Sequence, residues 1–147
     1  MREITLKEIR TMLKAANKTA EKAGKPSTIA IVDFGGHLRG LERPEGGRIA
    51  NVDIATKKAW TAIAFKRPTE MVRAMIISDG PAYGLQHTDD RICIVAGGFP
   101  IVEKGAYLGA IGASGGTLQE DIDCCLDGLK AAGFDTDFVN PNPVATK

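Results

Sequence analysis

The sequence has few aromatic residues, almost no net charge and no long apolar segment. Aromatic residues make up 5% of the 147 positions, and the formal net charge is +1. Since no basic stripe is evident either, nucleic-acid binding is disfavoured. No apolar run approaches the roughly 20 residues that cross a membrane, and the charged start MREITLKEIR is unlike a signal peptide. We therefore expect a cytoplasmic protein without nucleic-acid or membrane partners.

Cysteine is also scarce, with three residues and none of the paired spacings that bind zinc. Cys93 lies in an apolar run and Cys125 on the apolar face of a predicted helix, so both are expected in the core. The length and the hydrophobic content of 44% fit a single domain, which we assign to residues 1–134. Residues 135–147 lack periodicity and form a tail that is either disordered or laid across another subunit.

Two capping boxes mark the first and last helices. They are Thr5–Glu8 and Thr117–Glu120, and the helices that they begin are expected to end before Gly24 and Gly133. Asn51 is the predicted N-cap of the second helix. The predicted order is α-β-β-α-α-β-β-β-α, with helices near 5–23, 51–65, 68–78 and 117–132 and strands near 28–32, 37–43 and, as three runs, between 92 and 116. The hairpin-connected strands favour an α+β fold with an antiparallel sheet.

The last strand consists almost entirely of small residues. From Gly109 to Gly116 only Ile111 is large. Because strands normally prefer β-branched and aromatic residues, a run this small indicates that something approaches the sheet closely. A helix, a neighbouring subunit and a flat ligand all satisfy this requirement. We expect Ala110 and Gly112 in a central strand.

Several motifs follow one another along the chain in a specific order. They are Ile29–Asp33 with Gly35–Leu38, Glu42-Arg43, Asp53–Ala55 with Lys58-Ala59, Gly97–Ile101, and Leu108–Gly116. In this order they resemble the GlcG/HbpS family, which also includes the C-terminal domain of PduO. The resemblance implies a profilin-like fold, with a five-stranded antiparallel sheet and flanking helices, assembled into homo-oligomers. It also implies haem binding or haem degradation.

The chain departs from this family at two places. In some members a histidine of the first helix has been linked to haem iron, whereas residues 5–23 contain no histidine here. The segment Pro44–Gly47 follows Arg43, where a Met-Asp-Gly-Ala type of sequence is common in the family. Haem is nevertheless the candidate cofactor that the resemblance implies.

Four side chains are candidates for chemistry or for binding a charged ligand. His87, in the loop before the third strand, is suited to ligate iron or to act as a general base, and the alternative is an exposed loop histidine. Asp33 is a second candidate for proton transfer, although capping its own turn is its first task. Arg43 and Lys58 are the candidates to bind a carboxylate. The amine of Lys58 either snorkels to water, which we favour, or meets that ligand.

The glycine-rich breaks are candidates for backbone contacts with a ligand. Gly97 and Gly98 offer bare backbone with amide donors, and the alternative is a β-bulge that lets Pro100 begin a strand. Ser114 and the three amides that follow it, at a helix N-terminus, are candidates to bind a carboxylate, and the alternative is that Glu120 of the capping box occupies this positive end. We expect the break Gly97–Pro100, Arg43, Lys58 and the loop carrying His87 to converge, within one chain or across a subunit boundary.

Three hypotheses of function follow. The first is a binding protein for haem or another tetrapyrrole-type small molecule that bears carboxylates. The second is a catabolic enzyme, such as a tautomerase, isomerase or hydrolase, that acts on a small organic acid. The third is a sensor or assembly subunit without chemistry of its own.

Overall fold

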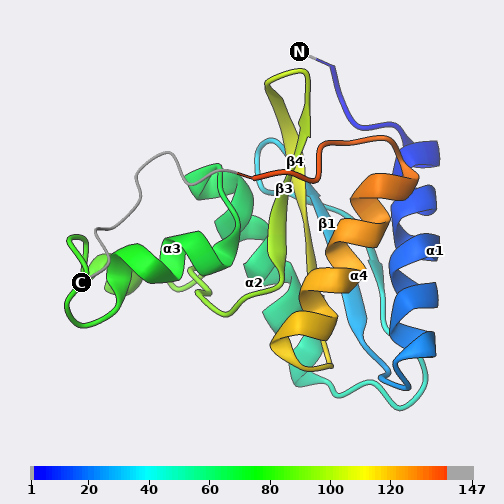
Figure 1. Ribbon diagram of the computed structural model, residues 1–147, viewed down its shortest axis with the longest axis horizontal. Coiled ribbons are helices and arrows are strands. Elements are labelled where there is room, and N and C mark those ends of the chain that lie inside the picture. The colour runs from blue at the N-terminus through cyan, green and yellow to red at the C-terminus, as the bar shows by residue number, and fades with distance from the viewer. Residues whose placement is uncertain (1, 139–147) are drawn as a thin grey trace.

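The protein is an antiparallel sheet covered by helices on both faces, as a computed structural model that describes residues 2–138 shows (Figure 1). The strand order in the sheet is β2-β1-β4-β3. α1 and α4 pack side by side over one face, and α2 packs on the other. The elements are, in chain order, α1 (Leu6–Lys22), β1 (Thr28–Asp33), β2 (Leu38–Glu42), α2 (Ala50–Phe65), α3 (Thr69–Ile76), the 3-10 turn η1 (Leu85–His87), β3 (Gly98–Glu103), β4 (Ala106–Ser114) and α4 (Leu118–Ala131).

Both predicted capping boxes are present. The Thr5 hydroxyl accepts the amide of Glu8 and the Glu8 carboxylate accepts the amide of Thr5, and Thr117 and Glu120 repeat this pattern in α4. The prediction for α2 is wrong at its first residue. Ile49 occupies the N-cap position, and the buried Asn51 side chain accepts a hydrogen bond from the Ser114 hydroxyl instead.

The predicted fifth strand is absent from residues 2–138, where the sheet has four strands. The observed order of elements therefore has one strand fewer than the predicted order. The run 92–96 was expected to form it. The amide of Cys93 instead donates to the hydroxyl of Thr61 in α2, at 2.8 Å. A side chain of α2 therefore takes the place of a strand partner, and the sheet edge begins only at Gly98.

A helix accounts for the small residues of β4. β4 pairs with β1 on one side and β3 on the other, so Ala110 and Gly112 lie in a central strand, as predicted. A Cβ at Gly112 would lie 2.2 Å from the carbonyl oxygen of Ala55 and 2.8 Å from the amide nitrogen of Ala59. The backbone of α2 therefore occupies the space in which a flat ligand or a second subunit was also conceivable.

The larger core lies between the sheet and the α1–α4 pair, and Cys125 and Cys124 belong to it. The expectation for Cys125 is confirmed, whereas Cys93 is only half-buried. Burial raises the pKa of the Cys124 thiol to about 12, which makes it a poor nucleophile. Of the predicted tail, Phe138 packs against Phe99 at 5.4 Å between ring centroids. Residues 139–147 lie outside the described residues.

None of the helices within residues 2–138 combines the length and the apolar composition that a membrane crossing requires.

Candidate functional site

Lys58 is buried and paired with a carboxylate. Its side chain is 1% exposed, and Nζ donates to the carbonyl oxygen of Ala113 at 2.8 Å and to Asp121 Oδ2 at 3.1 Å. The expectation that this amine reaches water is therefore wrong. Lys58 belongs to α2 and Asp121 to α4, and these helices cover opposite faces of the sheet. The ion pair therefore links the two faces near the end of β4, where Ala113 lies.

The same carboxylate occupies the loop that leads into α4. The amide of Gly116 donates to Asp121 Oδ1 at 3.1 Å, and the amide of Thr117 donates to the Glu120 side chain at 2.8 Å. Burial raises the pKa of Asp121, while the Lys58 charge and the Gly116 amide oppose that rise. The helix N-terminus that was expected to attract a ligand carboxylate thus already holds two carboxylates of the chain.

The glycine break packs against this buried pair. A Cβ at Gly97 would lie 3.1 Å from Lys58 Nζ, and a Cβ at Gly98 would lie 2.5 Å from the Lys58 carbonyl oxygen. The amide of Gly98 donates to Thr69 Oγ1 at 3.1 Å. Pro100 lies in the edge strand β3, and the register of β3 shifts between Ile101 and Val102 rather than at the glycines. One end of the sheet therefore buries Lys58, Gly97, Gly98 and Ser114. The close packing there explains why positions 97 and 98 are glycines.

Asp33 forms the expected turn and also contacts a histidine. Its Oδ1 accepts the amides of Gly35 and His37 at 3.0 and 2.9 Å and lies 3.3 Å from His37 Nδ1. His37 is 82% exposed, so its imidazole lies beside this carboxylate at the surface. The structural role of Asp33 is to cap this turn through the two backbone amides.

His87 is exposed at the end of η1. η1 follows α3, which extends away from the sheet at the β3 side (Figure 1). Within the described part of the chain, no three side chains of His, Cys, Asp or Glu come together as a metal-binding group. Metal binding by His87 therefore stays a prediction that needs a ligand or a second subunit.

A broad groove lies on the opposite edge of the sheet, beside Arg43. Two cavities, of about 800 and 590 Å³, share Asn17, Glu21 and Glu42, and we call them together the α1–β2 groove. The remaining lining residues are Arg10, Leu13, Lys14, Lys18, Ala20, Gly24, Lys25, Pro26, Leu41, Arg43, Pro44 and Glu45. Eight of these fifteen lining residues are charged, and Leu13, Ala20, Pro26, Leu41 and Pro44 supply apolar contacts.

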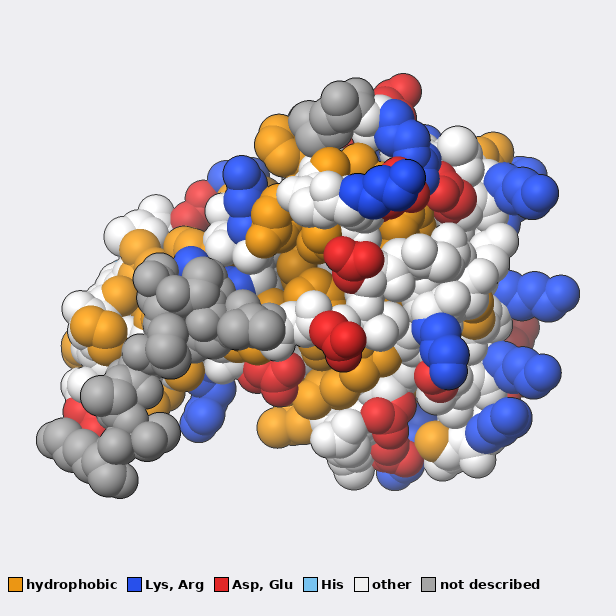
Figure 2. Space-filling view, turned by 45° about the horizontal axis from the view of Figure 1, so that its top comes forward, with side chains coloured by type: hydrophobic (Ala, Val, Ile, Leu, Met, Phe, Trp, Pro, Cys, Tyr) orange, Lys and Arg blue, Asp and Glu red, His pale blue; other side chains and the backbone are white. Residues whose placement is uncertain are grey.

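A row of basic side chains extends along α1 beside this groove. Figure 2 shows Lys and Arg side chains gathered at the right-hand edge of the molecule, over α1. The row consists of five exposed residues, Lys7, Arg10, Lys14, Lys18 and Lys22. Sequence analysis missed it, although steps of three and four residues place these side chains on one helical face. The case against nucleic acid therefore depends on the low net charge and the few aromatic residues alone.

Within one chain the predicted site residues form separate groups. Arg43 follows β2, whereas His87 precedes β3, and these strands are the two edges of the sheet. Lys58 and the glycines are buried at one end of the sheet, and Asp33 lies at the β1–β2 turn. The structure therefore does not bring Arg43 and His87 together in a single chain, and their convergence across a subunit boundary stays a prediction.

Comparison with known proteins gives the family. The family described as "Haem degrading protein HbpS-like" matches residues 4–130. An uncharacterised 15.0 kDa protein from the dhaT-dhaS intergenic region of Citrobacter freundii is 33% identical over 119 residues, which cover 80% of this chain and 84% of that protein. The chain belongs to the HbpS-like family, and the resemblance to GlcG and HbpS proteins is confirmed.

Two further relatives connect the chain to PduO. The corrinoid adenosyltransferase PduO of Citrobacter freundii is 29% identical over 134 residues, which cover 90% of this chain but only 40% of PduO. The crystal structure of a PduOC–haem complex superimposes with a TM-score of 0.88 at 26% identity, and the match covers 92% of this chain and 99% of that chain. The likeness thus extends over nearly the whole described fold.

Proposed function

We propose that this protein binds haem or a related tetrapyrrole in the α1–β2 groove. The observation that carries the proposal is a broad groove whose lining combines apolar side chains with five cationic ones. Membership of the HbpS-like family and the likeness to the PduOC–haem complex support the choice of ligand. Haem has a flat apolar ring and two carboxylates, so it requires both kinds of surface.

The residues present fit such a ligand in size and charge. A volume of about 800 Å³ lies within the range of small-molecule sites. Leu13, Ala20 and Leu41 offer apolar contacts to the ring. Arg43 and Lys25 offer positive charge to the carboxylates, and the planar guanidinium of arginine can bind a carboxylate through two hydrogen bonds. Since Glu21, Glu42 and Glu45 line the same part of the groove, the ligand carboxylates would have to lie directly against these two cations.

Titration of the protein with haemin, followed by the Soret band, tests the proposal. We expect saturable binding, and Arg43→Ala should weaken it by about 1.5–3 kcal/mol, the usual worth of a hydrogen bond to a charged group. Arg73→Ala removes the same charge from α3 and serves as the matched control. Absence of a saturable Soret change, or equal binding by both variants, would contradict the proposal. A loss of the band over time with ascorbate and oxygen would indicate degradation in addition to binding.

The enzyme hypothesis has one observation in its favour, the contact between Asp33 and His37. In this second proposal, His37 takes a proton from the carbon next to the keto group of a small keto acid, and the electron pair of that C–H bond passes to the keto oxygen to give the enolate. Proton exchange of such acids in D2O, followed by NMR, tests it. Exchange that His37→Ala abolishes would support a tautomerase or isomerase, and the absence of exchange across a panel of keto acids would count against one.

A further inference from the structure

We infer that the α1–β2 groove holds its tetrapyrrole through the carboxylates and the apolar ring face, without a bond to the metal. The inference depends on the proposed function and specifies the ligand class. The groove should accept metal-free porphyrins as readily as haem.

The side chains that line the groove are of the wrong types to bind haem iron. Protein ligands of haem iron are the imidazole of His, the thiolate of Cys, the thioether of Met and the phenolate of Tyr. Among the described residues that line the groove, none is of these four types. The cationic side chains of the lining are donors only and have no lone pair to offer a metal.

The histidines of the chain also lie away from the groove. The chain has two histidines. His37 lies at the β1–β2 turn, at the other end of β2 from Arg43 and in contact with Asp33, and His87 precedes the opposite sheet edge. Asn17, the lining amide nearest the middle of α1, donates to Glu42. No imidazole of the same chain therefore belongs to the groove.

The groove as a whole carries a positive excess. Its lining carries Arg10, Lys14, Lys18, Lys25 and Arg43 against Glu21, Glu42 and Glu45. The excess lies on the α1 side, in the smaller part of the groove, and the exposed Lys7 and Lys22 extend it along the helix. Opposite charges at a cleft raise the local concentration of an anionic ligand and its association rate. Recognition then depends on the two carboxylates rather than on iron.

Binding of four porphyrins under identical conditions tests the inference. They are haemin, zinc protoporphyrin IX, metal-free protoporphyrin IX and protoporphyrin IX dimethyl ester. The first three should bind with dissociation constants within about threefold of one another, and the ester should bind at least about tenfold more weakly. Arg43→Ala should weaken the three acids by a similar factor and leave the ester unchanged, whereas Arg73→Ala should change none of them.

The outcomes separate this inference from the proposed function. Haemin that binds more than about tenfold tighter than the metal-free acid would overturn the inference but leave haem binding intact. A haemin spectrum that changes in His37→Ala or His87→Ala would do the same, because it would show an imidazole on the iron, including one from a second copy. Failure of all four porphyrins to bind would overturn the proposed function itself. Ester binding equal to that of the acid would contradict the role given to the carboxylates.

Discussion

Lys58 and Asp121 are the residues whose pairing matters most to the interior. Both are buried, and each is the partner that compensates the charge of the other. Lys58→Met leaves the Asp121 carboxylate buried without its counter-charge and should lower the free energy of unfolding by about 3–5 kcal/mol. Urea denaturation measures this change.

A second substitution separates charge from packing at this pair. In Lys58→Met with Asp121→Asn no unpaired charge remains, so most of the lost stability should return. Equal destabilisation of the single and the double variant would show that the Lys58 side chain acts through packing alone. The ion pair would then have no special role.

Gly112 is the residue at which α2 approaches the sheet most closely. Its substitution by Ala would force a methyl group against the Ala55 carbonyl, 2.2 Å away, and should cost about 1–3 kcal/mol or more. Gly105 is the matched control, because a Cβ at this position would have no atom within 4 Å. The only source of strain for an alanine there is the positive φ of 81°. Gly105→Ala should therefore cost about 1 kcal/mol. A Gly112→Ala protein no less stable than Gly105→Ala would contradict the close contact.

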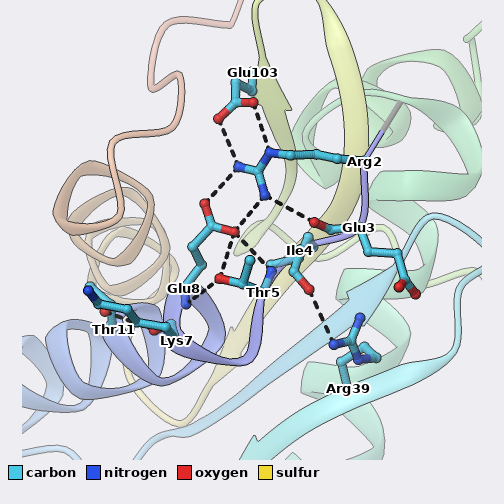
Figure 3. Close-up of polar contacts among 9 residues, drawn as sticks. All are labelled: Arg2, Glu3, Ile4, Thr5, Lys7, Glu8, Thr11, Arg39 and Glu103. Carbon is cyan, nitrogen blue, oxygen red and sulfur yellow. Dashed lines mark hydrogen bonds and ion pairs between the residues drawn. The ribbon is translucent and has the colours of Figure 1, made fainter.

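At the scale of elements, Arg2 fastens the start of the chain to α1 and the β3–β4 hairpin (Figure 3). Its guanidinium donates to both carboxylate oxygens of Glu8 at 2.7 Å and to Glu103 at 2.9 and 3.1 Å. The hydrogen bonds from Arg2 lower the pKa of Glu8 from 4.5 to about 2. Glu8 also closes the capping box of α1. One carboxylate thus serves both the helix end and the tertiary contact.

This arrangement predicts a pH dependence of stability. A carboxyl group with a depressed pKa stabilises the folded state above its unfolded pKa of about 4.5, and the contribution is lost as the pH falls toward about 2. Glu8→Gln can keep the capping hydrogen bonds but removes the charge. It should therefore lower the free energy of unfolding at pH 7 by about 1–2 kcal/mol, allowing for solvent screening.

Denaturation of both proteins across this pH range gives the test. The difference in stability between them should shrink from pH 4.5 downward and vanish near pH 2. A difference that is constant over the whole range would assign the effect of Glu8 to its hydrogen bonds rather than to its charge.

The elements that could be predicted are those that local sequence determines. The capping boxes at Thr5 and Thr117 specify where α1 and α4 begin, since their hydrogen bonds span only three residues. The run 92–96 has the composition of a strand, but the Thr61 hydroxyl of α2 takes its Cys93 amide. Only the tertiary structure could reveal that competition.

The candidate site was harder to predict than the fold. The partner of Lys58 is 63 residues away, so no local pattern indicated that its amine is buried. Arg43 was predicted to bind a carboxylate because of its guanidinium, and in the structure it lines the α1–β2 groove. The basic row on α1 needed only helical spacing and was predictable, whereas the groove depends on how α1 meets the edge strand β2.

At the scale of the whole molecule, we expect several copies to associate. Leu38 and Ile49 expose large apolar side chains, and β2 and β3 are sheet edges whose backbone groups can pair further. Sedimentation at micromolar concentration should give a mass that is a multiple of 15.6 kDa. A stable species of 15.6 kDa at that concentration would contradict the expectation and would leave Arg43 and His87 in separate sites.

The central claim is that a haem-type ligand occupies the α1–β2 groove, and NMR with ferric haemin tests it most directly. Paramagnetic iron broadens the amide signals of nearby residues, whichever group holds the ligand. We expect broadening of amides in residues 17–26 and 41–45, with residues 84–88 and the buried strand β4 unaffected. Broadening centred on residues 84–88, with the groove unaffected, would show that the ligand binds elsewhere.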